Sequence, residues 1–332
     1  MTDTLDIAIV GASSMAGEAL LSVLESRKFP VGRLYLLDGE ENAGEDVIYI
    51  KQEIIVQPIA DFDFNQARLV FIADPELEAH CSEGLFGTEC VVIHATGESV
   101  IDLQQPVVIP GVNHDEVDGA HLWLASPASA FIASVLKPIH DACEIERIDL
   151  VSMHAVSGAG KAAQEELGQQ TASLLGFREA QTQVFPKQIA FNVIPQVGEV
   201  DAQENSVVEQ RIENELRQCF GEAIEVSASA IRIPAFYGCA ISLHVQVQKP
   251  VSYAELYELI ETVAQIGKDD TPTPVSHSSG KDEVFVGRLR MQGNSGQQFK
   301  LWVVGDDIRL GMATNSVQLA EILVKKSFIS YS

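Results

Sequence analysis

The sequence has few basic residues, few aromatic residues and no long apolar run. Its 332 residues include 22 Lys and Arg against 47 Asp and Glu, and the formal net charge is -25. Proteins that bind nucleic acid draw much of their affinity from Lys and Arg on phosphate, so this excess of acid argues against nucleic acid and against an anionic membrane surface. We expect a partner or ligand that is a small molecule or another protein.

Cysteine is scarce and is not arranged to bind metal. The five cysteines are odd in number and none stands in a CxxC or comparable spacing, so we expect no metal site. They are typical of buried thiols in a reducing compartment. No apolar run reaches the roughly 18 residues that a membrane helix needs, and the start "MTDTLDIAIVGASS" has no basic region of a secretory signal. We therefore expect a cytoplasmic protein without a membrane segment.

The first part of the sequence predicts a nucleotide-binding unit. The apolar run Leu5–Val10 leads directly to Gly11 and to "GASSMAGEALLSVLESR", whose apolar residues recur at helical spacing. Strand, glycine turn and helix in this order begin a doubly wound α/β sheet of the Rossmann type, in which the helix N-terminus can receive a pyrophosphate. Further strand candidates follow at "RLYLLD", "ARLVFIAD", "CVVIHAT" and "PVVIP".

The glycine turn carries the cofactor prediction. Ser14 stands where the dinucleotide fingerprint has its middle glycine, which costs room although the hydroxyl can donate to phosphate. Asp38 ends the next strand, about 20 residues after the turn, where an acid accepts from ribose hydroxyls and repels a 2′-phosphate. We expect NAD, bound weakly if at all, and not NADP. The expected cofactor-binding residues are Gly11, Ser13, Ser14, Met15, Gly17, Asp38, Ser157 and Gly158.

The second part predicts an α+β unit that dimerises. A strand and a glycine-rich turn at "IERIDLVSMHAVSGAG" precede alternating strands at "SASAIRIPAFYGCAISLHVQVQ", "EVFVGRLRMQ" and "QFKLWVVGDD", and the helix "MATNSVQLAEILVKK" comes last. Antiparallel strands with helices on one face leave the other face to be covered, and a second copy of the chain is a common solution. We therefore expect a homodimer.

Several segments, in this order, resemble the aspartate-semialdehyde dehydrogenase family over nearly the whole chain. They are "GASSMAG", "VVIPGVN", "SPAS" with "LKPI", "AVSGAG", "IAFNVIPQVG", "IRIP", "VFVGRLR" and "NSVQLAE". The resemblance implies a Rossmann-like NAD(P)-binding domain over residues 1–131 and an α+β dimerisation domain over 132–311. It also implies that a C-terminal helix, 312–332, packs back on the first domain.

The resemblance also implies where the catalytic groups should stand. The family reduces an acyl phosphate with NADPH through a thioester, which needs a thiolate nucleophile and a base. Ser129 stands in the position of the nucleophilic cysteine, and Cys239 in that of the histidine base. His154 precedes "AVSGAG", where the family has glutamine, and Arg232 of "IRIP" matches the arginine that binds the substrate carboxylate. A serine hydroxyl attacks only with a partner base, which a thiol does not supply.

The groups that would bind phosphate are replaced as well. Val100 stands in the position of an arginine, Glu209 in that of a helix lysine, and Val207 in that of an acid two residues earlier. The pair that would hold the 2′-phosphate of NADP corresponds to Gly39 and Glu41. These replacements remove the reason for an acyl phosphate or NADP to bind.

We interpret the chain as a Usg-type homologue of the family that is catalytically inactive, a dimeric protein that binds a nucleotide, another ligand or a partner. Two alternatives stay open. In one, Ser129 and His154 form a serine–histidine pair for acyl transfer in an enzyme of altered specificity. In the other, weak aspartate-semialdehyde dehydrogenase activity persists.

Overall fold

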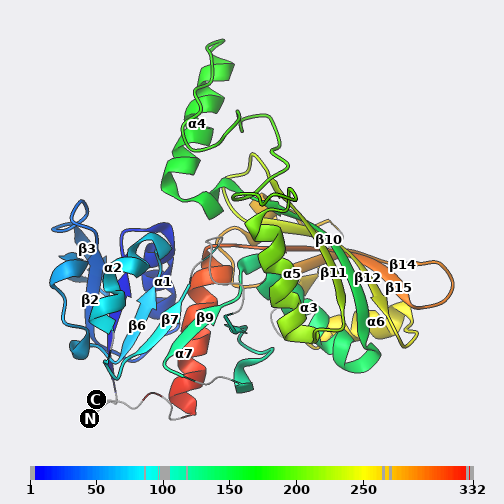
Figure 1. Cartoon of the computed structure of the whole chain (residues 1–332), viewed down its shortest axis with the longest axis horizontal. Coiled ribbons are helices and arrows are strands. Elements are labelled where there is room, and N and C mark those ends of the chain that lie inside the picture. Colours follow the sequence, from blue (N-terminus) through cyan, green and yellow to red (C-terminus); the bar gives the residue numbers. More distant parts are fainter. Residues whose placement is uncertain are drawn as a thin grey trace. The chain divides into compact units, whose positions relative to one another are not determined.

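In the computed structural model the chain folds into two compact units (Figure 1). The residues described are 4–85, 87–95, 97, 105–116, 119–263, 266–268, 271–326 and 329. Among them, the first unit comprises those up to Gly97, Gln105–Leu124 and those from Met312 onwards, and the second comprises Ala125–Gly311. The expected first domain, 1–131, therefore overlaps the second unit, because helix α3 (Pro127–Cys143) begins before its end.

Apart from β3 and β4, the described strands of the first unit form a seven-stranded parallel sheet in the order β5-β2-β1-β6-β7-β9-β8. The doubly wound Rossmann-like domain predicted from the sequence is confirmed. The strands are β1 (Leu5–Val10), β2 (Val31–Asp38), β5 (Gln57–Pro58), β6 (Leu69–Ile72), β7 (Val91–His94), β8 (Val107–Val108) and β9 (His121–Leu124). The helices are α1 (Met15–Ser26), α2 (Glu78–Leu85) and α7 (Asn315–Lys325), and β3 (Asp46–Tyr49) with β4 (Gln52–Ile55) forms a separate hairpin.

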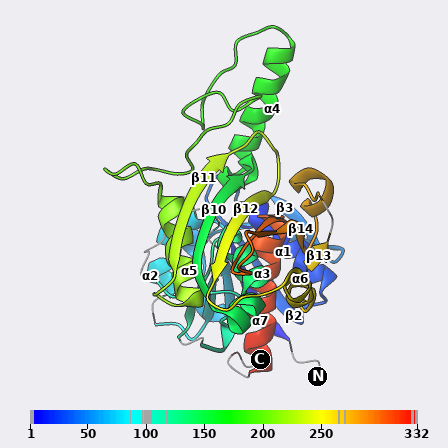
Figure 2. The ribbon, with the colours of Figure 1, turned by 90° about the vertical axis from the view of Figure 1, so that its right-hand side faces the viewer.

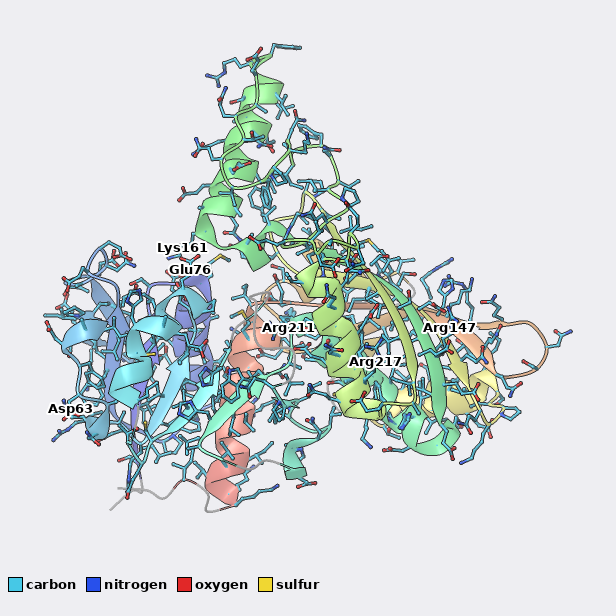
Figure 3. All side chains as sticks on the ribbon, viewed as in Figure 1. Asp63, Glu76, Arg147, Lys161, Arg211 and Arg217 are labelled. Carbon is cyan, nitrogen blue, oxygen red and sulfur yellow. The ribbon has the colours of Figure 1, made fainter. Side chains whose placement is uncertain are left out.

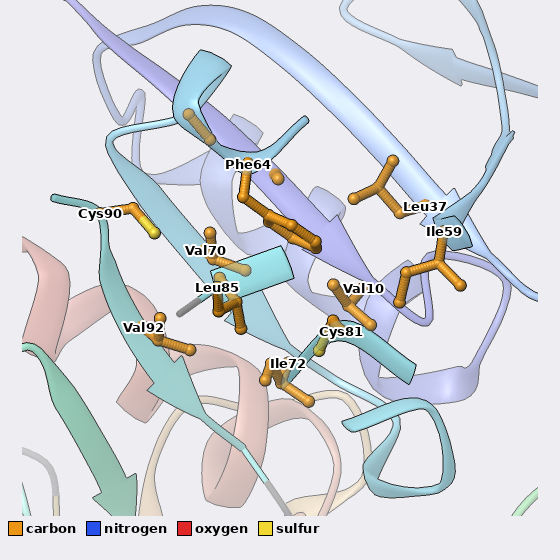
Figure 4. Close-up of a cluster of buried hydrophobic side chains, with 12 residues drawn as sticks. Val10, Leu37, Ile59, Phe64, Val70, Ile72, Cys81, Leu85, Cys90 and Val92 are labelled. Atoms are coloured by element: carbon orange, nitrogen blue, oxygen red, sulfur yellow. The ribbon is translucent and has the colours of Figure 1, made fainter. Parts of the chain in front are cut away.

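The core of the first unit lies where β1, β2, β6 and β7 meet α2 (Figure 4). Phe64 is its largest member and belongs to the same buried cluster as aliphatic side chains of all four strands. Burying each such side chain is worth about 1.5–3 kcal/mol, which explains why these strands are almost continuously apolar. The cluster comprises Ala8, Val10, Leu37, Ile59, Phe64, Ala67, Val70, Ile72, Cys81, Leu85, Cys90 and Val92.

The C-terminal helix α7 belongs to the first unit and packs beside α1. Arg27 ends α1 and donates to both carboxylate oxygens of Glu321 on α7, at 2.9 Å and 2.7 Å. Such a bidentate contact fixes geometry better than a single hydrogen bond does. It joins two helices that are far apart in the sequence.

The described strands of the second unit form a six-stranded sheet in the order β11-β10-β12-β15-β14-β13. The α+β domain predicted from the sequence is confirmed, but β11 and β13 run parallel to their neighbours, where we expected antiparallel strands only. The strands are β10 (Ile145–His154), β11 (Glu225–Arg232), β12 (Cys239–Val247), β13 (Ile266–Lys268), β14 (Val284–Gln292) and β15 (Gln298–Gly305). The helices are α3, α4 (Lys161–Leu175), α5 (Val207–Phe220) and α6 (Tyr253–Glu261).

Helices α3 and α5 cover one face of this sheet (Figure 2). Alternate residues of β10, among them Ile148 and Leu150, are buried on that face, as period-two alternation predicts. Phe131 of α3 lies against Gly305 of β15, where an added Cβ would come within 2.4 Å of the ring. Only glycine therefore lets the start of α3 approach the sheet so closely.

Helix α4 projects from the sheet together with the segment that follows it (Figures 1 and 2). A small apolar cluster that includes Leu167, Phe185 and Ile189 holds this segment against α4. The buried carboxylate of Glu166 accepts hydrogen bonds from the backbone N–H groups of Gln183 and Val184. The segment is thus anchored by its own polar and apolar contacts.

Short helical turns connect the longer elements. They are η1 (Ile59–Asp61), η2 (Phe64–Gln66), η3 (Pro75–Leu77), η4 (His114–Glu116), η5 (Val156–Ala159), η6 (Pro274–Ser278) and η7 (Arg309–Thr314). The five cysteines are free thiols, four buried and Cys219 partly exposed. Across the ranges given above, we find no helix with the length and apolar character of a membrane span.

Candidate functional site

Ser129 lies in the first turn of α3 and is fully buried. Ser126 is the N-cap of this helix, and its Oγ accepts from the backbone N–H of Ser129 at 3.4 Å. Pro127 follows at the first helical position, where a missing N–H costs nothing. This sequence of capping serine and proline explains why the helix begins here and why Ser129 points into the protein.

The hydroxyls of Ser129 and Ser126 form a chain that ends on the carboxylate of Glu215. The two Oγ atoms are 3.0 Å apart, and Ser126 Oγ is 2.5 Å from Glu215 Oε2. Because a hydroxyl has one proton and the carboxylate can only accept, Ser126 donates to Glu215 and Ser129 donates to Ser126. The backbone N–H of Ser126 also donates to both oxygens of Glu215, at 3.0 Å each.

Arg211 completes this network from the same helix as Glu215, α5 (Figure 3). Its Nε donates to Glu215 Oε1 at 2.7 Å, and both side chains are only 3% exposed. Neither residue was predicted from the sequence. The available signal was a charged i,i+4 pair among the core-facing positions of α5, beside Ile212 and Leu216, because charges on an apolar face are rarely buried unpaired.

Glu209, expected at the position of a phosphate-binding lysine, holds two backbone N–H groups. One oxygen accepts from Ser206 at 2.7 Å in a capping box, and the other accepts from Ala230 of β11 at 2.9 Å. Val207 is the first residue of α5. Val100, the third of these expected positions, lies outside the described residues. Glu209 therefore stabilises the start of α5 and ties this helix to the sheet.

Three of the expected site residues lie side by side at the ends of adjacent strands. His154 of β10 is in register with Arg232 of β11 on one side and with Cys239 of β12 on the other. All three are buried. The Nε2 of His154 is 2.9 Å from Ser152 Oγ, whereas the hydroxyl of Ser129 bonds to Ser126. The geometry thus joins His154 to Ser152 and does not join it to Ser129.

Arg232 is buried beneath the segment that follows α4. Its Nη1 donates to the carbonyl oxygen of Ala155 at 2.6 Å, and its guanidinium carbon lies 5.9 Å from the centre of the Phe185 ring. Both contacts suit a guanidinium, which donates in its plane and stacks on aromatic faces. The resemblance implies that Arg232 binds a substrate carboxylate. In the structure, its guanidinium contacts groups of the protein itself.

Asp307 is a third buried residue that was not predicted from the sequence. It follows β15 and accepts from Ser157 Oγ at 2.6 Å and from the Gly238 N–H at 2.8 Å. It thereby joins the glycine-rich turn at 156–160 to the turn that precedes Cys239. Ser157 and Gly158, both expected at the cofactor, lie in the first of these turns, and the Gly158 N–H donates to Ala155 at 3.4 Å.

The glycine turn of the first unit has the backbone that a nucleotide requires. Gly11 has a φ of +80°, which favours glycine. A Cβ on Gly17 would lie 2.3 Å from the Gly11 carbonyl oxygen, so α1 could not pack so closely on β1 with any other residue. Ser14 is the N-cap of α1, and its Oγ accepts from the Gly17 N–H at 3.1 Å. Met15 begins the helix.

Asp38 lies at the end of β2, buried, and accepts three hydrogen bonds from the turn and from its own loop. The N–H groups of Ser13 and Gly39 and the side-chain amide of Asn42 each donate to it at 2.9 Å. Ser13 Oγ in turn donates to Glu45 at 3.1 Å. Asp38, the acid predicted at the end of the second strand, thus lies at the end of β2 beside the glycine turn.

Acidic side chains gather around this turn. Asp38 accepts from the Ser13 N–H, Glu45 accepts from Ser13 Oγ, and the Glu41 carboxylate lies against Gly39, the residue after Asp38. The backbone fits a nucleotide, because the first N–H groups of α1 can receive an anion. Among the described residues, those of this turn included, no group of three or more His, Cys, Asp or Glu is placed to hold a metal.

Two protein-family models match the chain. The semialdehyde dehydrogenase NAD-binding domain matches residues 6–120, and the semialdehyde dehydrogenase dimerisation domain matches 136–310. Aspartate-semialdehyde dehydrogenase 2 of Vibrio cholerae is 36% identical over 99% of this chain and all of its own length. The chain belongs to the aspartate-semialdehyde dehydrogenase family. Its membership, inferred from ordered motifs, is confirmed.

Similar proteins include one that is not named as a dehydrogenase and one that is. The USG-1 protein homolog of Pseudomonas aeruginosa is 34% identical over 98% of this chain and 99% of its own length. The crystal structure of aspartate semialdehyde dehydrogenase II from Vibrio cholerae, complexed with ASA, has a TM-score of 0.92 at 35% identity and covers 97% of this chain and 98% of that chain. The chain is therefore similar to family members with and without the dehydrogenase name.

Proposed function

We propose that this member of the family has lost the dehydrogenase chemistry and acts as a dimeric protein that binds a ligand or a partner. The observation that carries the proposal is the state of Ser129. It stands in the position of the nucleophile, is fully buried, and commits its hydroxyl to Ser126 and through it to Glu215. A group held in this way supports the start of α3 and is not presented to a substrate.

The charge of Glu215 also favours a structural role for this network. A carboxylate that accepts from the N–H and the hydroxyl of an N-cap residue lies at the positive end of the helix dipole of α3. Arg211 compensates its remaining charge. These contacts tie the carboxylate of Glu215 to the N-cap of α3 and to Arg211, which favours a role in holding the two helices together.

The base position supports the same proposal. Cys239 is buried at the start of β12, and its cross-strand neighbour His154 contacts Ser152. Acyl transfer by Ser129 and His154, the first alternative, needs the imidazole within hydrogen-bond reach of the hydroxyl. The hydrogen bonds of Ser129 are made with Ser126 instead. The second alternative, weak aspartate-semialdehyde dehydrogenase activity, is tested by an assay of turnover.

We also propose that a second copy of the chain covers the outer face of the second sheet. The half-buried side chains of Val151, Met153 and Ile231 gather near one end of that face, on β10 and β11. Trp302 of β15 lies in register with Ser242 of β12, the neighbour of Val151. This apolar patch lies within the family's dimerisation domain. A two-fold contact through it would bury the patch against itself.

The turnover of aspartate semialdehyde tests the proposed loss of chemistry. Purified protein is assayed for NAD- and NADP-linked oxidation, in parallel with an active family member under the same conditions. We expect no rate above background. A kcat/KM within about tenfold of the active member, a difference of about 1.4 kcal/mol in barrier, would contradict the proposal. Esterase activity that disappears in Ser129→Ala would favour acyl transfer instead.

A further inference from the structure

Two aspartates flank Gly11 at the carboxyl edge of the first sheet. The strands β2, β1 and β6 are adjacent and parallel, and they lead to Asp38, Gly11 and Asp74 respectively. The Gly11 N–H donates to Leu37, the residue before Asp38, and the Ala73 N–H, next to Asp74, donates to Val10. Ligands of doubly wound sheets bind at this edge. The turn therefore has a carboxylate on each side.

Asp74 lies directly against the turn. A Cβ added to Gly11 would come within 2.4 Å of Asp74 Cβ and 2.8 Å of its backbone nitrogen. Burial raises the pKa of the Asp74 carboxyl, and the charges of Glu76, Asp38 and Glu41 act in the same direction, against a backbone hydrogen bond that lowers it. The negative charges on the two sides of the turn are thus close enough to act on one another.

Most donors of the turn are already used within the protein. The Ser13 N–H donates to Asp38, the Ser14 N–H to the Gly11 carbonyl oxygen, and the Gly17 N–H to Ser14 Oγ. In the part of the chain described here, the N–H groups of Met15 and Ala16 have no protein partner, as expected for the first turn of a helix. A diphosphate would find these two donors and a carboxylate on either side.

We propose that Asp38 and Asp74 make the turn selective for an uncharged nucleoside over a dinucleotide with its diphosphate. Asp38 accepts three hydrogen bonds and has room for about one more, which a ribose hydroxyl can supply. Asp74 supplies the charge that disfavours phosphate near Gly11. The inference rests on a nucleotide site in the first unit, but it is independent of whether the second unit catalyses a reaction.

The substitution Asp74→Asn removes the charge and keeps the local structure. Asp74 is the N-cap of η3, where its Oδ1 accepts from the Glu76 N–H at 2.9 Å, and asparagine caps a helical turn equally well. Glu76→Gln is the matched control, because Glu76 is exposed and lies two residues further along (Figure 3). Both variants lose one negative charge, and only the first loses it beside the turn.

Calorimetry with adenosine and with ADP-ribose measures the effect without any assay of turnover. The wild type should bind adenosine at least as tightly as ADP-ribose. Asp74→Asn should raise the affinity for ADP-ribose about tenfold and leave that for adenosine within about twofold, because adenosine has no charge to repel. Glu76→Gln should change each affinity by less than about twofold.

The direction in which Asp74→Asn changes the affinity for ADP-ribose decides whether the inference holds. It is overturned if the wild type binds ADP-ribose about tenfold more tightly than adenosine, or if Asp74→Asn fails to bind ADP-ribose or binds it no better. A weaker affinity in that variant would mean that Asp74 accepts from a ribose. Salt provides a test on the wild type alone: screening of the repulsion should strengthen ADP-ribose binding as ionic strength rises, and weakening would overturn the inference.

Discussion

Ser126 at the start of α3 donates its hydroxyl proton to Glu215 of α5, at an Oγ–Oε2 distance of 2.5 Å. The two residues are 89 positions apart in the sequence. In a capping box the acid that receives the N-cap N–H comes from the same helix. Here the acid that accepts from the N-cap N–H, Glu215, lies on a different helix, α5. The contact therefore joins the start of α3 to the buried Arg211, which is bonded to Glu215.

The first prediction concerns Glu215. Glu215→Ala should lower the free energy of unfolding by about 3–5 kcal/mol, because it leaves the Arg211 guanidinium buried without its carboxylate. Chemical denaturation measures the change, and Glu222→Ala, at an exposed position shortly after α5, is the control. A loss below about 1 kcal/mol would show that the pair contributes little to stability.

The second prediction is that one substitution does not restore dehydrogenase activity. Ser129→Cys returns a thiol, but its neighbours remain Ser126 and Glu215, and Cys239 supplies no imidazole. Groups that act together lose activity non-additively, so restoring one member should recover little. NADP-linked turnover is compared for Ser129→Cys and for Ser129→Cys with Cys239→His. Robust activity of the single variant would mean that the remaining site is intact.

The third prediction concerns Glu209. Replacing it by lysine, as the family pattern suggests, should destabilise the protein by about 1–2 kcal/mol, since the capping box of α5 and an acceptor for Ala230 are both lost. Thermal denaturation measures this effect. Gln210→Lys, at the next position, is the control. An unchanged melting temperature in Glu209→Lys would argue against the structural role.

The fourth prediction concerns pH and the imidazole of His121. Its Nδ1 lies 3.2 Å from Nε2 of the buried His94, whose Nδ1 lies 2.9 Å from Glu78 and whose ring stacks on Trp123. Burial lowers the pKa of His121, and the neighbouring His94 lowers it further, against Glu78, which raises it. The folded protein therefore resists the proton that the unfolded chain accepts below about pH 6.5.

This contribution to stability should be complete above that pH and should be lost progressively as the pH falls below it. The free energy of unfolding is measured across this range for the wild type and for His121→Asn. The variant should show the weaker dependence on pH, since it lacks the titrating ring. Identical pH profiles for the two proteins would exclude this role of His121.

The fifth prediction concerns assembly. Met153→Lys should convert the proposed dimer into a monomer, because it would place a charge within the apolar patch of the outer sheet face. Light scattering at micromolar concentration measures the mass, and Ser279→Lys, at an exposed position outside the sheet, is the control. A monomeric wild type would contradict the proposed dimer at once.

The sixth prediction concerns the cofactor. If a dinucleotide binds, NAD should bind more tightly than NADP, because Asp38 and Glu41 repel a 2′-phosphate. Glu41→Arg should reduce this preference, and competition binding measures both ligands on both proteins. Tighter binding of NADP by the wild type would refute the assignment of Asp38.

Local patterns were sufficient to predict most of the architecture. The apolar run at β1, the glycine at the start of the turn and the period of α1 all depend on neighbouring residues, so the doubly wound unit could be inferred from them. Asp38 could be placed because its spacing from the turn is nearly constant in this fold. Ser129 was placed by the family resemblance, and its burial in the first turn of α3 became visible only in the structure.

The partners of these residues were decided only by the tertiary structure. Glu215 and Asp307 act on groups far away in the sequence, and no local pattern encodes such a distance. The parallel pairing of β10 with β11 likewise depends on how α5 returns the chain to the sheet. Asp74 follows β6 by two residues, but only the strand order places it beside Gly11. Side-chain type is local, whereas the electrostatic field at a site is summed over every element that packing brings near it.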